Sequence, residues 1–264
     1  MNRLALCALL TLLLCGCAST TPGGVPIDTR YTAKGQDSRA LFLVIHYTVG
    51  SFESALQLLT EGEVSAHYLI SDEAPPVIYR LVDENRRAWH AGPSYWRGQT
   101  MLNASSIGIE IAHPGFRNTA QGREYLPYPK AQIDALIPLV KDIVARHGVL
   151  PERVLGHSDI APQRKEDPGP MFPWKRLADE GIVPWPDAAR VAAQRVLFEA
   201  VLPDLAWFQQ ALGRHGFYVP RTGVVDDETK RVLSSFQMRY RPSDYSGQPD
   251  AETAALLHVL TTPP

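Results

Sequence analysis

Two of the eight histidines stand where a folded chain could use them for chemistry. His46 follows a short apolar run, Leu41–Ile45, which is typical of a strand buried on both faces. His157 lies near the start of the segment 156–170, which is rich in proline and charged residues. Imidazoles serve as metal ligands or as proton donors and acceptors. Spacing alone does not pair residues so far apart, and each histidine could instead be exposed or hydrogen-bonded.

Glu110 is the candidate acid. The segment Ile107–Ala112 alternates strictly, so its isoleucines share one face of a strand and Glu110 lies on the other. Its carboxylate therefore points away from the apolar face, either into a cleft or, as the ordinary alternative, to solvent from an edge strand. Lys165 is a further charged residue of the segment 156–170. Without other information, it is expected to be a surface cation among charged neighbours.

The segments around these residues predict strands and helices in turn. Buried or alternating apolar runs predict strands at residues 41–45, 64–70, 77–82, 107–112 and 154–155. Helical spacing predicts helices at 51–59, begun by Ser51 and stopped by Gly62, and at 133–147, closed by Gly148. The sequence thus predicts a mixed α/β domain over residues 28–186.

Four strings carry a family resemblance: Ile45–Thr48, Trp89–Gly92, Ile107–Glu110 and Gly156–Pro170. Their residues and order resemble the zinc-dependent N-acetylmuramoyl-L-alanine amidases of type 2. These AmpD/AmiD-like enzymes are related to phage amidases and animal peptidoglycan recognition proteins. The resemblance covers residues 39–174 and implies a mixed β-sheet flanked by helices. It also implies hydrolysis of the amide bond between the lactyl group of N-acetylmuramic acid and L-alanine, in peptidoglycan or muropeptides.

The resemblance assigns roles to residues of the site. It makes His46, His157 and Asp167 the ligands of one Zn²⁺ ion, with Asp159 as a rival acidic ligand. Two imidazoles and a carboxylate suit zinc and leave a fourth position for water. The resemblance makes Glu110 and Lys165 the catalytic pair. The residues expected to contact substrate are Tyr47, His67, Trp89, His90 and Asn103.

Residues 187–264 predict a small three-helix domain. The stretches Gly223–Leu233 and Gly247–Leu257 both place an aspartate three residues before a threonine, ahead of an apolar helix face. Aspartate at that position is a strong helix N-cap. This repeat resembles the peptidoglycan-binding domain attached to many cell-wall hydrolases, and a generic helical cap is the alternative.

The N-terminal residues predict a targeting signal. Arg3 precedes an apolar run, Leu4–Leu14, that is too short to span a bilayer and typical of a secretory signal. The small residue Gly16 before Cys17 resembles a bacterial lipoprotein signal, which implies residues 1–16 as signal peptide, lipidation of Cys17 and a tether over 17–27. Ala18 implies sorting to the outer membrane, with the protein facing the periplasm.

Composition excludes several classes. The net charge of −2 gives no basic excess for neutralising phosphates, so we expect no nucleic-acid partner. With 45% hydrophobic and 20% charged residues, the chain is not wholly disordered. Only its N-terminus carries a long apolar run, so we expect no polytopic membrane protein. Two other hypotheses stay open. One is a non-catalytic peptidoglycan-binding protein of the same fold, and the other is a glycosidase that uses Glu110 with an aspartate.

Overall fold

The computed structural model describes residues 19–120 and 122–262. The predicted signal peptide and Cys17 lie outside the described residues. Contacts divide the chain into residues 1–37 and 38–264. The first unit includes the short strand pair β1 (Ser19–Thr20) and β2 (Pro26–Ile27). Among the described residues, no helix has the length and apolar character needed to cross a membrane.

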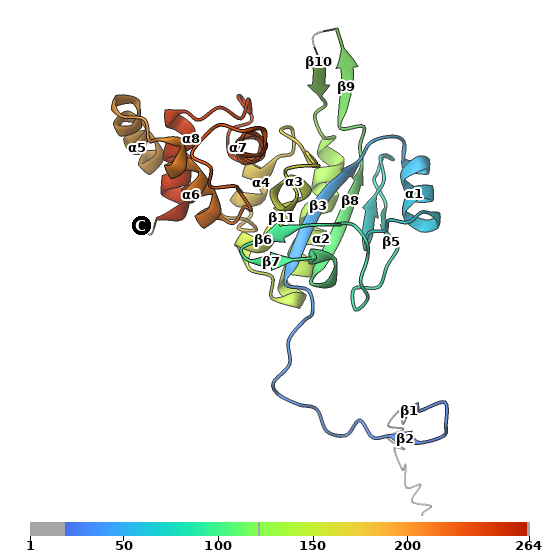
Figure 1. Cartoon of the computed structure of the whole chain (residues 1–264). Coiled ribbons are helices and arrows are strands. Elements are labelled where there is room, and N and C mark those ends of the chain that lie inside the picture. The colour runs from blue at the N-terminus through green and yellow to red at the C-terminus, as the bar shows by residue number, and fades with distance from the viewer. Residues whose placement is uncertain (1–18, 121, 263–264) are drawn as a thin grey trace, which may run out of the picture. The chain divides into compact units, whose positions relative to one another are not determined.

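A five-stranded sheet forms the centre of the second unit (Figure 1). Its order is β11-β3-β8-β4-β5, where the first four strands are parallel and β5 is antiparallel to β4. The bounds are β3 (Phe42–Thr48), β4 (Tyr68–Ile70), β5 (Ile78–Arg80), β8 (Ser106–Ala112) and β11 (Val154–Gly156). All residues of β3 and β8 are buried, as expected for central parallel strands.

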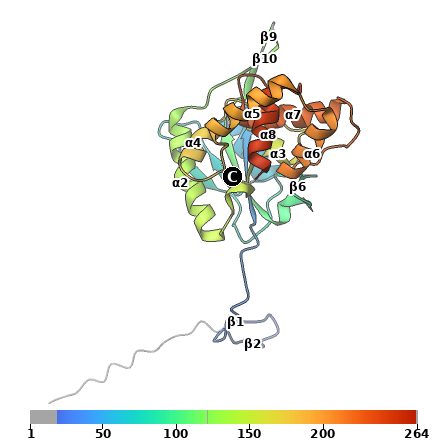
Figure 2. The same cartoon turned by 90° about the vertical axis from the view of Figure 1, so that its left-hand side faces the viewer.

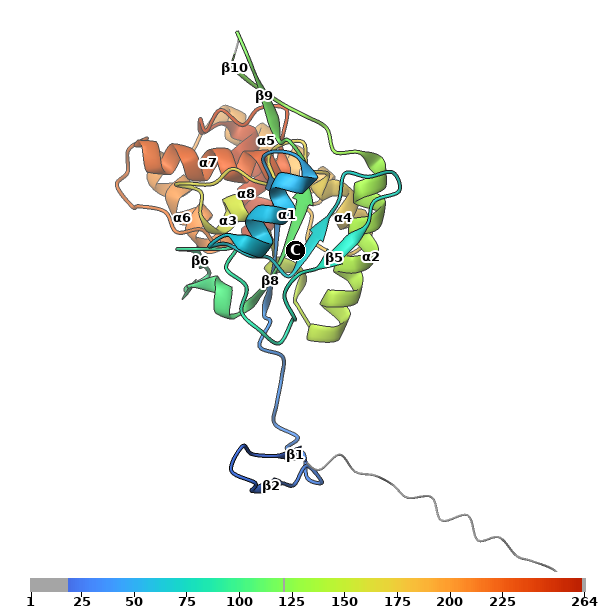
Figure 3. The ribbon, with the colours of Figure 1, turned by 90° about the vertical axis from the view of Figure 1, so that its right-hand side faces the viewer.

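Helices cover both faces of this sheet. Helix α2 (Lys130–His147) packs its apolar stripe on Ile107, Ile109 and Ile111 of β8. Helix α1 (Phe52–Glu61) packs on the opposite face, against Leu69 and Ala112, and Figure 3 shows the two helices on either side of the strands. Because side chains alternate along a strand, Gly108 and Glu110 share the face that α2 does not cover.

The predicted helix ends are observed. Ser51 accepts a hydrogen bond from the N–H of Ser54 at 3.3 Å at the start of α1, and Gly62 is its C-cap. Gly148 ends α2 in the left-handed conformation, with φ of 65°.

The long loops add small elements, namely β6 (Tyr95–Trp96), β7 (Gln99–Thr100), η1 (Leu102–Ala104), η2 (Pro151–Arg153), α3 (His157–Ile160) and α4 (Trp174–Asp179). The hairpin of β9 (Phe116–Thr119) and β10 (Gly122–Tyr125) projects from the sheet in Figure 1.

The C-terminal region consists of α5 (Ala188–Ala200), α6 (Leu205–His215), α7 (Asp227–Tyr240) and α8 (Ala251–Thr261). Asp226 and Asp250, the repeated aspartates of the sequence, cap α7 and α8 by accepting from the N–H groups of Thr229 and Thr253. Helix α5 precedes the three predicted helices as an additional one.

The helical region and the sheet share one hydrophobic core. A continuous cluster joins Phe42, Val44 and Leu155 of the sheet to Phe208 and Phe236 of α6 and α7. Figure 2 shows the C-terminal helices in front of the sheet on this side. The contact is therefore part of the folded core, and it brings α7 close to the segment that contains His157.

Candidate active site

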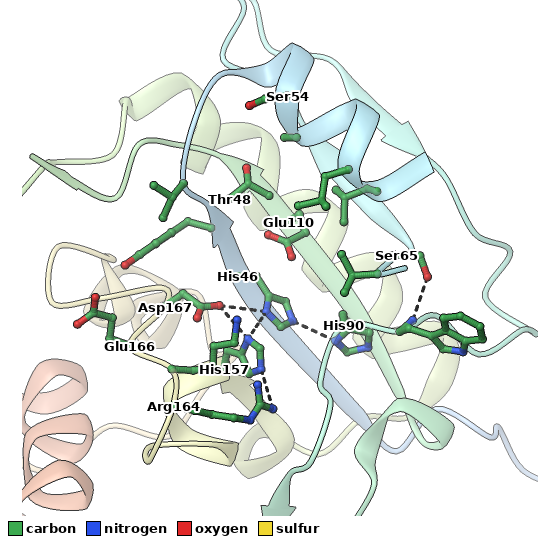
Figure 4. Close-up of a pocket in the computed structure, with 18 of the residues that line it drawn as sticks. His46, Thr48, Ser54, Ser65, His90, Glu110, His157, Arg164, Glu166 and Asp167 are labelled. Atoms are coloured by element: carbon green, nitrogen blue, oxygen red, sulfur yellow. Dashed lines mark hydrogen bonds and ion pairs between the residues drawn. The ribbon is translucent and has the colours of Figure 1, made fainter. Parts of the chain in front are cut away.

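Three side chains converge at the carboxyl end of the parallel strands (Figure 4). Nδ1 of His46 lies 2.9 Å from Nδ1 of His157, and both nitrogens lie 3.1 Å from Oδ2 of Asp167. All three residues are buried, and their ligand atoms are close enough to hold one metal ion. Two imidazole nitrogens and one carboxylate oxygen are a donor set that zinc accepts, with a position left open.

Strand pairing explains why two distant histidines meet. Gly156 of β11 is the register partner of Ile45 in the parallel β3, so His46 and His157 follow at the same edge of the sheet. His157 is the first residue of α3. Asp167 comes from the loop after α3 and returns to this edge, where its backbone carbonyl accepts from the N–H of Ser158 at 2.8 Å.

Hydrogen bonds behind the histidines fix which nitrogen faces the cluster. The Ser106 hydroxyl donates to the Leu102 carbonyl at 2.6 Å, so its oxygen is left to accept from Nε2 of His90 at 3.1 Å. Nδ1 of His90 then accepts from Nε2 of His46 at 3.0 Å. Nδ1 of His46 consequently carries a lone pair toward the cluster, as a metal ligand requires.

In His157, a contact with a backbone carbonyl favours the same tautomer. Its Nε2 lies 3.2 Å from the carbonyl oxygen of Ala91, which only accepts, and 3.4 Å from Nη2 of Arg164, which only donates. The shorter contact favours a proton on Nε2, and this tautomer leaves Nδ1 free to bind a cation. Burial lowers the pKa of His46 to about 4, so His46 is neutral at neutral pH.

Glu110 faces the metal cluster from the neighbouring strand. It is the register partner of His46 in the β3–β8 pair, and its carboxylate points toward His46 in Figure 4. Burial, and then the charge of Asp167, raise the pKa of Glu110 to about 8, against a lowering effect of Lys165. Its Oε2 is buried without a hydrogen-bond partner among the described residues. Lys165 lines the same pocket, so the five predicted metal and catalytic residues are brought together.

The pocket around the cluster has a volume of about 550 Å³. Tyr47, Trp89 and His90 line it, as expected for residues near substrate. Trp89 is the most open of these, with 53% of its surface exposed. The hydroxyl of Tyr47 is buried and has no partner within the described part of the chain. His90 is already engaged by His46 and Ser106, so its evident role is to hold His46.

Comparison with known proteins places this site in a family. Residues 36–170 match the N-acetylmuramoyl-L-alanine amidase family, and residues 202–257 match the family described as a putative peptidoglycan binding domain. The chain is 46% identical, over 94% of both chains, to the N-acetylmuramoyl-L-alanine amidase AmiD of Escherichia coli. It belongs to the N-acetylmuramoyl-L-alanine amidases.

Solved amidase structures have the same architecture. The E. coli AmiD complex with anhydro-N-acetylmuramic acid-L-Ala-D-γ-Glu-L-Lys superimposes with a TM-score of 0.80 at 43% identity, covering 91% of this chain and 96% of that one. AmpDh3 of Pseudomonas aeruginosa in complex with anhydromuramic pentapeptide gives 0.81 at 40% identity, covering 88% and 96%. The likeness therefore includes the sheet and the helical region together.

Asp159, the alternative acidic ligand, has other partners in the structure. Asp159 is not part of the metal cluster, because its Oδ2 accepts from the backbone N–H of Gly156 at 2.8 Å and pairs with Arg239 at 2.5 Å. A carboxylate engaged in this way is already satisfied. Asp167 is the acid that lies between the two histidines.

Two of the expected substrate contacts, His67 and Asn103, are not among the residues that line the amidase pocket. His67 is fully buried, and its Nδ1 accepts from the N–H of Gly108 at 3.0 Å. Oδ1 of Asn103 accepts from the N–H groups of His90 and Ala91 at 3.0 and 2.7 Å. Both side chains support the strand and loop that hold the histidines, since their polar atoms are used internally.

Other residues of the amidase site were not predicted from the sequence. Ser106 orients His90, and Arg164 donates to the carbonyl oxygens of Ala91 and Pro93. Ser54 and Leu58 of α1 line the pocket wall. Arg164 lies within the matching string beside Lys165, which was a usable signal, whereas nothing in the sequence around Ser106 marks a role for its hydroxyl.

Proposed function

We propose that this amidase uses zinc, bound by His46, His157 and Asp167, to hydrolyse the bond between the lactyl group of N-acetylmuramic acid and L-alanine. The observation that carries the proposal is the convergence of these three donors beside Glu110 in one pocket. Zinc in such a site is a Lewis acid that activates water near neutral pH. The donor set and its fixed tautomers fit that ion.

The protein's own groups then perform the proton transfers. In its ionised form, a carboxylate oxygen of Glu110 accepts the proton of the attacking water and returns it to the nitrogen of the departing L-alanine. A nearby cation lowers the pKa of this buried acid and so favours the ionised form at neutral pH. The ammonium of Lys165 stabilises negative charge that develops on the oxygen of the scissile carbonyl.

The substrate class follows from the amidase relatives and the C-terminal region. AmiD and AmpDh3 have been solved with muropeptides bound. We extend this class to the present chain, and we assign wall attachment to the region that matches the peptidoglycan-binding family. The products would be free glycan and a stem peptide that begins with L-alanine.

The test is digestion of purified peptidoglycan by the full chain, solubilised in mild detergent, with and without a chelator. We expect mass spectrometry to find intact stem peptides with free L-alanine N-termini, produced only when metal is present. Binding to the wall without cleavage, even with added zinc, would support the non-catalytic alternative. Release of sugar fragments that resists the chelator would support the glycosidase.

The proposed location is the periplasmic face of the outer membrane, with Cys17 lipidated. Its support is the sequence alone, namely the short apolar run before Gly16 and Cys17. Several acyl chains on one cysteine would give stable anchoring. Metabolic labelling with a fatty acid tests this, and Cys17→Ser should abolish both the label and the membrane fraction of the protein.

A further inference from the structure

A second hollow, here called the interdomain groove, adjoins the active-site pocket. It has a volume of about 550 Å³ and lies between the loop 162–166, strand β10 and helix α7. Arg164, Lys165 and Glu166 line both the groove and the active-site pocket. The two hollows are therefore adjacent and share the loop 164–166 as a common wall.

The interdomain groove carries an excess of positive charge. Its cationic lining residues are Arg123, Arg164, Lys165 and Arg231, against the single acid Glu166. Glu166 is already committed, because it forms an ion pair with Arg123 and accepts from the Tyr125 hydroxyl at 2.7 Å. Arg164, Lys165 and Arg231 thus have no matching carboxylate among the residues that line the groove.

Arg231 is a groove cation to which the active-site chemistry assigns no role. It is exposed on α7, and its Nη1 reaches the carbonyl oxygen of Gln163 at 3.4 Å. Within the described part of the chain, no carboxylate forms an ion pair with it. A guanidinium offers a planar fork of donors that matches a carboxylate.

We propose that the interdomain groove binds the carboxylates of peptidoglycan stem peptides, with Arg231 as the residue that contacts them. This inference rests on the proposed function and names a binding site for its substrate. A glutamate linked through its γ-carboxyl keeps a free α-carboxylate, and a stem peptide ends in another. Two sources offer this group, namely the stem under cleavage and a neighbouring stem on the same glycan.

The experiment compares substrates with and without carboxylates. The full chain and its Arg231→Ala variant are assayed on a muramyl tripeptide, on sacculi, and on both after amidation of their carboxyl groups. We expect Arg231→Ala to raise KM about three- to tenfold on a carboxylate-bearing substrate, the size of a partly exposed charge-assisted contact. The same variant should leave KM for the amidated forms unchanged. Arg231→Lys should recover part of the loss.

Matched controls separate this site from a general charge effect. Arg214, on α6, is likewise exposed and does not line the groove, so Arg214→Ala should behave as the wild type on every substrate. A rise in KM on the tripeptide identifies the cleaved stem as the source. A rise on sacculi alone identifies a neighbouring stem.

The inference is overturned if the KM of Arg231→Ala matches that of the wild type on both carboxylate-bearing substrates. It is also overturned if the substitution raises KM for the amidated substrates by the same factor. Calorimetric binding of the free peptide L-Ala-D-γ-Glu-L-Lys and co-sedimentation with sacculi supply readouts that need no catalysis. If the wild type cleaves nothing, the proposed function fails, while these binding measurements still decide the role of Arg231.

Discussion

Arg239 of helix α7 forms a buried ion pair with Asp159, which lies just after His157 in the chain. The two side chains are 2.5 Å apart and almost fully buried, and the guanidinium also lies over the ring of Trp174 at 4.0 Å. Beside this pair, the Ser235 hydroxyl donates to the carbonyl of Ser158 at 2.7 Å. The C-terminal helical region is thereby fastened to the segment that supplies a predicted metal ligand.

Removing one partner of this pair should destabilise the whole second unit. Arg239→Met leaves Asp159 buried without its cation, and we expect a loss of about 3–5 kcal/mol in the free energy of unfolding. The double variant with Asp159→Asn keeps the acceptor for Gly156 and should recover most of that loss. Urea unfolding of both variants measures the difference. A loss below about 1 kcal/mol in the single variant would show that the pair is not desolvated as described.

Gly108 should be required for metal binding although it contacts no metal ligand directly. A Cβ at this position would lie 2.4 Å from the ring of His90, which orients His46. We expect Gly108→Ala to displace that ring and to weaken zinc affinity by about 10- to 100-fold. Competition with a chromophoric chelator measures the affinity.

Gly213→Ala is the matched control for that prediction, because its added Cβ would meet no atom closer than 3.9 Å. A Gly108→Ala protein that binds zinc as tightly as the wild type would contradict the role assigned to His90.

Glu110→Gln should separate catalysis from metal binding. The amide keeps the shape of the side chain but does not accept the proton of water, so we expect kcat to fall by about 100- to 10,000-fold. Zinc content, measured by atomic absorption, should stay at that of the wild type. Glu61→Gln, an exposed change at the end of α1, is the control. Retention of more than a tenth of the wild-type kcat would exclude Glu110 as the base.

His215 should make stability depend on pH below neutrality. Burial, and then the charges of Arg239 and Arg97, lower its pKa from 6.5 to about 3. The unfolded chain binds a proton in that range and the folded one does not, so the contribution of His215 is present above pH 6.5 and is lost as pH falls toward 3. The limiting slope is about 1.4 kcal/mol per pH unit.

Urea unfolding of the wild type and His215→Phe at several pH values tests this. The variant should show a smaller decline in stability between pH 6.5 and 4.5, because the titrating group is gone. Tyr125→Phe is a control that leaves the buried histidine in place. An unchanged decline in His215→Phe would mean that other groups cause it.

The sequence by itself determined local structure and the chemical repertoire. Strict alternation in Ile107–Ala112 placed Glu110 opposite the isoleucines, and the repeated aspartates of the C-terminal region marked the starts of α7 and α8. These features depend on residues that are close together in the chain, so they can be predicted from the sequence. Family resemblance supplied the pairing of His46 with His157, which periodicity could not.

Tertiary structure decided what depends on distant contacts. Parallel pairing of β3 with β11 brings together two histidines that are 111 positions apart. Packing of α7 gave Asp159 its partner Arg239, and so left Asp167 as the acid at the cluster. The same packing created the interdomain groove. Such relations are set by which surfaces the core buries together, and no local pattern of residues encodes them.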